Sequence, residues 1–191
     1  MSPGYAAIAL TDAVRAAEAR MGSATAIGRR TAHDHVTTAA EPRDALTGFE
    51  QEFIADRDGF YLASVSATGW PYVQFRGGLP GFVHSPDTRA VTWADFRGNR
   101  QYISTGNVAD DDRVALFFMD YPHRLRLKVF GRARSTDARE QPDAARALVV
   151  PGDRGVVEQI VTVTVAAYDW NCQQHITPRY TLAELHPSGS V

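Results

Sequence analysis

The sequence predicts an α+β protein that is mainly β with flanking helices, its strands forming a closed or partly closed antiparallel barrel. From Gly59 onward the apolar residues recur with a period of two, which is typical of half-buried strands. Turn residues, such as those of Ala67–Pro71, separate five or six segments of this kind, and short helical patterns interrupt them. Strands interrupted by short helices favour a barrel with helices at its rim.

The composition is that of an ordinary globular protein, with 44% apolar and 22% charged residues in a chain of 191. That length is enough for one domain with a sizeable core. The net charge of −2 argues against nucleic acid as a partner. No apolar run approaches the roughly 18 residues that a membrane span needs, so no membrane association is expected. The one cysteine, Cys172, excludes an intramolecular disulfide, and we expect a reducing, cytoplasmic location.

Residues 1–45 are expected to form an N-terminal helix and an arm attached to what is a single domain overall. The pattern predicts a helix over about residues 11–20, with Thr11 or Asp12 as its cap. Residues 21–43 have the pattern of a loop or a partly ordered arm.

The barrel domain is expected over residues 46–191. Thr47 and Glu50 have the spacing of a capping box, which predicts a short helix ending near Arg57. The later elements, in chain order, are strands over Phe60–Ser66, Tyr72–Arg76 and Ala90–Ala94, a helix over Arg100–Ala109, strands over Arg113–Met119 and Arg124–Ser135, a helix over Pro142–Val149 and a strand over Val156–Ala167.

Alternation along the second strand separates polar from apolar side chains. Tyr72, Gln74 and Arg76 share one face, and Val73 and Phe75 share the other.

The long strand Arg124–Ser135 divides in the same way. The face expected in the barrel core consists of Leu125, Leu127, Val129 and Ala133. The opposite face carries a basic stripe of Arg124, Arg126, Lys128, Arg132 and Arg134. The stripe has two open interpretations, a solvated face or a groove that holds an anion.

The turn around Gly98 has the pattern of a phosphate site. Arg97 and Arg100 flank this turn, and a helix is predicted to start near Asn99 or Arg100. Helix N-termini expose unpaired backbone N–H groups and a partial positive charge, so added arginines repel that end unless an anion binds there. The pattern therefore predicts a bound phosphate.

The chain contains four segments, FYLASVSATGWPYVQFRGGLPGF, WADFRGNRQYISTGN, DDRVALFFMDYPHRLRLKVFGRAR and DWNCQQH, in this order. In sequence and order they resemble the pyridoxamine 5′-phosphate oxidase-like family of FMN-binding split barrels. The resemblance covers roughly residues 46–180. It implies a six-stranded antiparallel split barrel, a homodimer, and FMN held in two clefts at the dimer interface.

The resemblance also implies which residues hold the FMN phosphate. In such proteins a strand-to-helix turn with a basic residue binds this group. The matching residues here are Arg97, Asn99 and Arg100, with Tyr102 and Ser104 nearby.

A second set of residues is implied at the flavin ring, where the long strand commonly reaches over from the second subunit. These residues are Gln74, Arg76 and Gly77 of the second strand, Arg126 and Lys128 of the long strand, and Trp170 near the C-terminus, with Arg179 a weaker match by spacing.

The implied function is that of an FMN-dependent oxidoreductase acting on an unidentified small molecule, with reduced nicotinamide as a candidate electron donor. Two alternatives stay open, a flavin carrier or sensor without turnover, and a split barrel that uses F420 or haem. The spacing indicates no general acid or base. Pyridoxine phosphate oxidases carry a C-terminal Arg-x-His element that holds the substrate. No such element occurs within His175–Arg179 or beyond, so vitamin B6 oxidase activity is not expected.

Three further motifs favour structural interpretations over chemical ones. His33-Asp34-His35 has the pattern of solvated loop residues, and Asp110–Asp112 that of a polar loop after a helix. Cys172, close to Trp170, is expected to pack rather than to react. The sequence therefore predicts no metal site.

Overall fold

The computed structural model describes residues 4–23 and 44–185. Within them, one antiparallel sheet has the strand order β2-β1-β5-β6-β7-β4-β3. Its strands are β1 (Gly59–Val65), β2 (Pro71–Gly77), β3 (Val83–Asp87), β4 (Ala90–Phe96), β5 (Arg113–Asp120), β6 (Leu125–Asp137) and β7 (Val157–Trp170). The helices are α1 (Tyr5–Ala9), α2 (Asp12–Arg20), α4 (Gly48–Ala55), α5 (Ile103–Asp110), α6 (Pro142–Ala147) and α7 (Leu182–Leu185).

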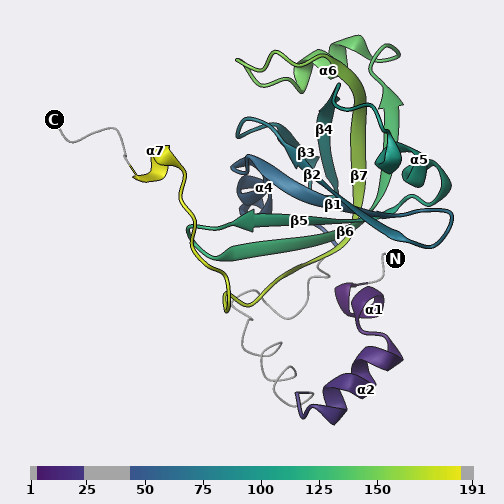
Figure 1. Cartoon of the computed structure of the whole chain (residues 1–191), viewed down its shortest axis with the longest axis vertical. Coiled ribbons are helices and arrows are strands. Elements are labelled where there is room, and N and C mark those ends of the chain that lie inside the picture. The colour runs from purple at the N-terminus through teal and green to yellow at the C-terminus, as the bar shows by residue number, and fades with distance from the viewer. Residues whose placement is uncertain (1–3, 24–43, 186–191) are drawn as a thin grey trace.

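The sheet bends into two halves that share its two longest strands (Figure 1). β6 pairs with β5 over residues 125–132 and with β7 over residues 127–137. β7 in turn pairs with β4 over residues 157–164. One half therefore continues through β5, β1 and β2, and the other through β4 and β3. The edge strands β2 and β3 do not pair with each other, so the barrel is not closed.

The number of strands differs from the expected six, because the sheet has seven. All of the predicted strands are present, and β3 is the additional one. Its sequence, VHSPD, contains Pro86, which has no backbone N–H to donate, and its pairing with β4 is irregular between His84 and Asp87. A short, polar edge strand tolerates these features but shows no period of two in the sequence.

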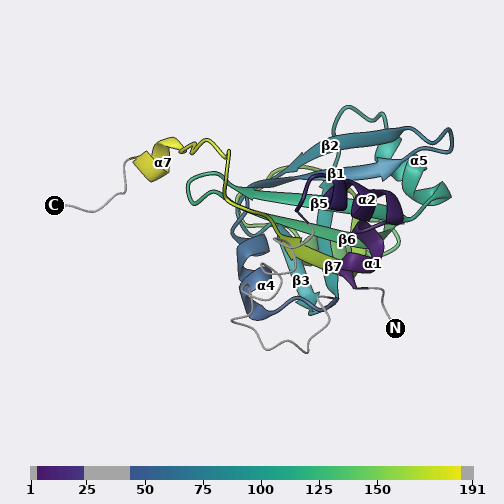
Figure 2. The same cartoon turned by 90° about the horizontal axis from the view of Figure 1, so that it is seen from below.

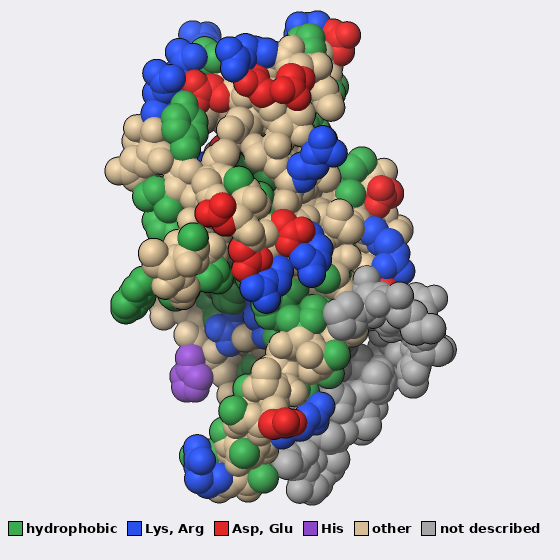
Figure 3. Space-filling view, turned by 90° about the vertical axis from the view of Figure 1, so that its right-hand side faces the viewer, with side chains coloured by type: hydrophobic (Ala, Val, Ile, Leu, Met, Phe, Trp, Pro, Cys, Tyr) green, Lys and Arg blue, Asp and Glu red, His purple; other side chains and the backbone are tan. Residues whose placement is uncertain are grey.

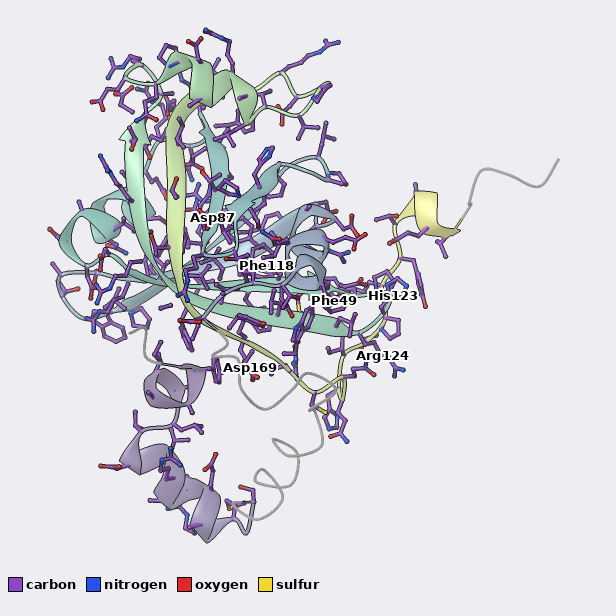
Figure 4. All side chains as sticks on the ribbon, turned by 180° about the vertical axis from the view of Figure 1, so that it is seen from behind. Phe49, Asp87, Phe118, His123, Arg124 and Asp169 are labelled. Carbon is purple, nitrogen blue, oxygen red and sulfur yellow. The ribbon has the colours of Figure 1, made fainter. Side chains whose placement is uncertain are left out.

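The core lies inside the bend of the sheet. The predicted core face of β6 is confirmed by its buried residues, Leu127, Val129 and Ala133. The ring of Phe60 lies 5.0 Å from that of Trp93 and 4.9 Å from that of Phe118. Figure 4 shows Phe118 directed into this interior. These aromatic side chains, buried together, contribute much of the apolar area that holds the two halves together.

Two predicted helix starts are confirmed. Thr11 caps α2, and its hydroxyl accepts from the backbone N–H of Val14 over 3.4 Å. Thr47 and Glu50 form the expected capping box at the start of α4. α6 also lies where a helix was predicted. None of the described helices is long and apolar enough to cross a membrane.

Helix α1 was not predicted, and it packs on the outer surface of the sheet (Figure 2). The ring of Tyr5 stacks on that of Phe130 at 5.4 Å, and its hydroxyl is hydrogen-bonded to Lys128. Most of the expected arm, residues 24–43, lies outside the described residues, as do His33 and His35.

Candidate functional site

The turn around Gly98 is a loop and not the start of a helix. The helix expected to begin near Asn99 or Arg100 begins at Ile103, which corrects that prediction. Arg100 and Tyr102 have left-handed backbones, with φ of 60° and 52°. The side chain of Asn99 accepts from the backbone N–H of Gln101 over 3.2 Å, a local bond that competes with helix formation. Arg97 and Arg100 therefore project from the loop before α5.

This loop forms one wall of two adjoining hollows. The Arg76 hollow, of about 160 Å³, is lined by Gln74, Arg76, Asp95, Phe96, Gly98, Asn99, Arg100, Tyr102, Thr105, Glu158 and Gln159. The Arg139 hollow, of about 580 Å³, is lined by Arg97, Arg100, Tyr102, Thr105, Asp137, Arg139, Val156, Val157, Glu158 and Gln159. Arg100, Tyr102 and Glu158 belong to both linings and so lie between the two hollows.

A charged network occupies this shared wall. Arg97 Nε donates to Glu158 Oε1 over 2.7 Å, and the Tyr102 hydroxyl donates to Glu158 Oε2 over 2.9 Å. Arg100 Nε donates to the Tyr102 oxygen over 3.0 Å and lies 3.9 Å from Glu158 Oε1. The hydrogen bond from Arg97, followed by that from Tyr102, lowers the pKa of Glu158. Glu158 is therefore a carboxylate at neutral pH.

The surface around α5 has the same mixed character. Figure 3 faces this side of the molecule and shows basic side chains next to acidic ones, without a large patch of either sign. An anion reaching this surface meets arginines that already have carboxylate partners.

A second ion pair lies deeper in the Arg76 hollow. Arg76 Nη1 and Asp95 Oδ1 are 2.9 Å apart, and the two side chains are 17% and 16% exposed. Burial raises the pKa of Asp95 more than the charge of Arg76 lowers it. Arg76 Nε is buried without a hydrogen-bond partner among the described residues. This N–H group is a free donor beside the hollow, which is where a bound ligand with acceptor atoms would satisfy it.

The face of β2 that carries Gln74 and Arg76 is the one that turns to the hollow, as alternation predicts. Gln74 is held there by Ser104, whose hydroxyl donates to Gln74 Oε1 over 3.1 Å. Ser104 is itself buried and does not line the hollow. Gly77 does not line it either, and a Cβ there would come within 2.8 Å of the Phe75 ring. Gly77 therefore makes room for Phe75.

The remaining predicted cofactor residues lie away from both hollows of the same chain. Arg126 Nη2 donates to the backbone oxygen of Cys172 over 3.0 Å. Lys128 Nζ contacts the Tyr5 hydroxyl and lies 3.8 Å from Asp169 Oδ2, on the side of the sheet that faces α1 (Figure 4). Trp170 Nε1 donates to Glu50 over 2.8 Å. The chain alone therefore brings only part of the predicted set together.

Neither interpretation of the basic stripe on β6 describes it fully. Arg124 precedes the strand with a left-handed φ of 57° at the β5–β6 turn (Figure 4). Arg126 and Lys128 are half-buried, whereas Arg132 and Arg134 are exposed. Arg132 Nη1 lies 2.5 Å from Asp112 Oδ1. The part of the stripe that consists of Arg132 and Arg134 is thus a solvated face.

Sequence reasoning missed the two acidic residues of the site, Asp95 and Glu158, and their neighbours Thr105 and Gln159. Thr105 and Ser135 both donate to Gln159 Oε1, over 3.0 and 2.9 Å. Glu158 is the third residue of the predicted strand Val156–Ala167, but no spacing rule marks it as part of a site. No cluster of three metal-ligating side chains occurs in the described ranges.

Comparisons with known proteins add to this picture. The sequence profile described as pyridoxamine 5′-phosphate oxidase matches residues 46–167, well over half of the chain. The search of curated proteins found no match. Among solved structures, HupZ of Group A Streptococcus is 16% identical over 71% of this chain and 100% of its own, with a TM-score of 0.53. A pyridoxamine 5′-phosphate oxidase candidate from Lactobacillus delbrueckii is 19% identical over 66% of this chain and 94% of its own, with a TM-score of 0.50. Both structures share the fold with this chain.

Proposed function

The chain belongs to the pyridoxamine 5′-phosphate oxidase family, and on that premise we propose that it binds FMN and is an FMN-dependent oxidoreductase acting on a small molecule. The observation that carries the proposal is the convergence of Arg97, Arg100 and Tyr102 beside the Arg76 hollow. Guanidinium and hydroxyl donors of this kind are suited to a phosphate group.

The donor set of the Arg76 hollow also fits the rest of the cofactor. Arg76 Nε is a buried donor without a described partner, and a flavin offers ring nitrogen and carbonyl acceptors. Gln74 is fixed by Ser104 with its amide beside the same space. Arg97 and Arg100 would bind the phosphate, and Arg76 and Gln74 would orient the ring. When bound, FMN supplies the hydride or electron transfer, while these side chains position it.

We further propose that the protein is a homodimer, formed through the outer face of the first half of the sheet. The strand register places apolar side chains in two rows there. One row consists of Val73, Ala63 and Ala115 and ends at Phe130, which the Tyr5 ring of α1 covers, and the next consists of Phe75, Tyr61 and Phe117. Val73 and Phe75 are 59% and 57% exposed. An exposed apolar patch of this kind is typical of a protein interface.

A second copy of the chain is the favoured occupant of this face, because two predicted cofactor residues lie on it. Lys128 continues the second row, and Arg126 lies on the same face. The resemblance assigns these residues to FMN, yet in one chain they lie away from both hollows. A partner subunit would supply them to the cofactor.

The absorbance spectrum of the purified protein separates the proposed cofactor from its rivals. FMN gives two visible flavin bands, haem gives a Soret band, and F420 absorbs near the violet. We expect the flavin spectrum. A Soret band or an F420 spectrum in its place would contradict the FMN assignment while leaving the fold intact.

Turnover separates an enzyme from a flavin carrier or sensor. Reduced nicotinamide added to the FMN-loaded protein should bleach the flavin bands without oxygen, and air should restore them. A flavin that neither this donor nor a panel of small reductants reduces faster than free FMN would favour a carrier or sensor.

Vitamin B6 oxidase activity is predicted to be low. The substrate phosphate would lack the charge-assisted hydrogen bonds of an Arg-x-His element, each worth about 1.5–3 kcal/mol. We expect little pyridoxal phosphate from pyridoxine phosphate in a coupled assay with the FMN-loaded protein. Turnover equal to that of a dedicated oxidase would show this prediction to be wrong.

A further inference from the structure

An irregularity in β7 directs a carboxylate into the arginine cluster. Asp95 pairs with Gln159 and Phe96 with Val157, which leaves Glu158 as the extra residue of a β-bulge. A bulge changes the direction of the side chain that it carries. Glu158 thereby lines both hollows, and only 18% of its side chain is exposed.

Glu158 already binds side chains that the proposed function assigns to the phosphate. Its two oxygens accept from Arg97 Nε and from the Tyr102 hydroxyl, and Arg100 Nε is 3.9 Å away. The side chains of Arg97 and Arg100 are 54% and 62% exposed, so they are accessible from solvent while the carboxylate between them is mostly covered. The carboxylate thus lies between the two arginines, in the position that a phosphate bound by both of them would take.

We propose that Glu158 is an internal competitor for the FMN phosphate, an inference that rests on the proposed function. A carboxylate and a phosphate dianion repel each other, so both cannot occupy the same donors. Binding of the phosphate to Arg97 Nε and the Tyr102 hydroxyl then requires the Glu158 side chain to leave these two donors. The loss of these bonds subtracts from the binding free energy, and Glu158 sets the affinity for phosphate-bearing ligands below what the arginines alone would give.

The neutral variant Glu158→Gln tests this directly, because glutamine keeps the shape of the side chain and removes its charge. We expect FMN to bind roughly 3- to 10-fold more tightly, between the effects of an exposed ion pair and of a charge-assisted hydrogen bond. Riboflavin, which lacks the phosphate, should bind with unchanged affinity. Asp143→Asn is the matched control, because it removes the same charge from an exposed residue of α6, outside both hollows.

Inorganic sulfate gives a second measurement that does not depend on the flavin. At equal ionic strength, replacing chloride by sulfate should raise the melting temperature of Glu158→Gln more than that of the parent or of Asp143→Asn. Equal shifts in all three proteins would contradict competition at this site.

The outcomes separate the inference from the proposed function. If the parent binds FMN and Glu158→Gln binds it equally, competition is wrong. If Glu158→Gln binds it more weakly, competition is also wrong and Glu158 instead positions the arginines. If no variant binds FMN, the proposed function fails, and the sulfate measurement still decides whether Glu158 excludes anions.

Discussion

Trp170 connects the last strand of the sheet to the first helix of the barrel domain. Its indole N–H donates to Glu50 Oε1 over 2.8 Å, and its ring lies 4.6 Å from Phe53 and 5.4 Å from Phe49. The other oxygen of Glu50 accepts from the backbone N–H of Thr47 over 2.9 Å. Glu50 is buried, so both of its oxygens need partners. In this chain the tryptophan therefore stabilises the fold, whatever it contributes to a cofactor.

Trp170→Phe is predicted to lower the free energy of unfolding by about 1–3 kcal/mol, because it leaves a buried carboxylate oxygen without its donor. Urea denaturation of the two proteins measures the difference. Trp70→Phe is the control, since that tryptophan is 76% exposed at the β1–β2 turn. Equal effects of the two substitutions would contradict a structural role for the Trp170–Glu50 bond.

At the scale of elements, alternation predicted the strands and the core face of β6 but not the bulges of β7. One bulge singles out Glu158, and another occurs where Phe130 pairs with Ala167 and Gly131 with Val165. An inserted residue shifts the alternation of the strand by one, so that each side chain beyond it points to the opposite face of the sheet from the one that alternation predicts. A pattern of apolar residues does not reveal such an insertion, because the register also depends on the neighbouring strand.

The start of α5 escaped prediction for a related reason. The sequence pattern predicted a helix from near Asn99 or Arg100, whereas the Asn99 side chain and two left-handed residues delay it to Ile103. Local hydrogen bonds of this kind outweigh the weak intrinsic preferences of a short helix. The backbone of this loop was thus predicted wrongly, and the phosphate site at Arg97 and Arg100 stays a prediction.

Two glycine substitutions test this description of the elements. A Cβ at Gly131, beside the second bulge, would lie 2.4 Å from Val163 Cγ1 and 2.6 Å from Thr164 O. Gly131→Ala should therefore destabilise the protein by about 1–3 kcal/mol. Gly106 lies within α5 with nothing within 4 Å of its Cβ position, so Gly106→Ala should stabilise by about 0.5–1 kcal/mol. Thermal unfolding of both variants measures these effects, and shifts of the same sign would contradict the packing described.

At the scale of the whole molecule, the predicted site residues divide into two groups. Gln74, Arg76, Asn99, Arg100 and Tyr102 line one hollow. The others include Arg126, Lys128 and Trp170, none of which lines either hollow. Sequence periodicity shows which residues share a face of a strand, but it does not show which faces of two chains meet. The second subunit was implied by the family resemblance and not by the periodicity, and the homodimer stays a proposal that is based on the exposed side chains of Val73 and Phe75.

Light scattering should report about twice the chain mass of 20.9 kDa. Val73→Lys places a charge in the apolar rows and should shift the protein towards the monomer, with weaker FMN binding. Leu182→Lys, at a residue of α7 that is 78% exposed, should leave the dimer intact. A monomeric parent that still binds FMN tightly would exclude the proposed interface.

The central claim, that the loop of Arg97 and Arg100 holds the FMN phosphate, is tested most directly by titrating FMN and riboflavin into the parent, Arg97→Ala and Arg100→Ala. Each substitution removes a charge-assisted hydrogen bond worth roughly 1.5–3 kcal/mol, which corresponds to an FMN dissociation constant about 10- to 150-fold higher. Riboflavin affinity should barely change, and Arg146→Ala on α6 should alter neither ligand. Equal losses for both ligands would place the arginines at the ring or in the fold, and no loss for either would contradict the phosphate site.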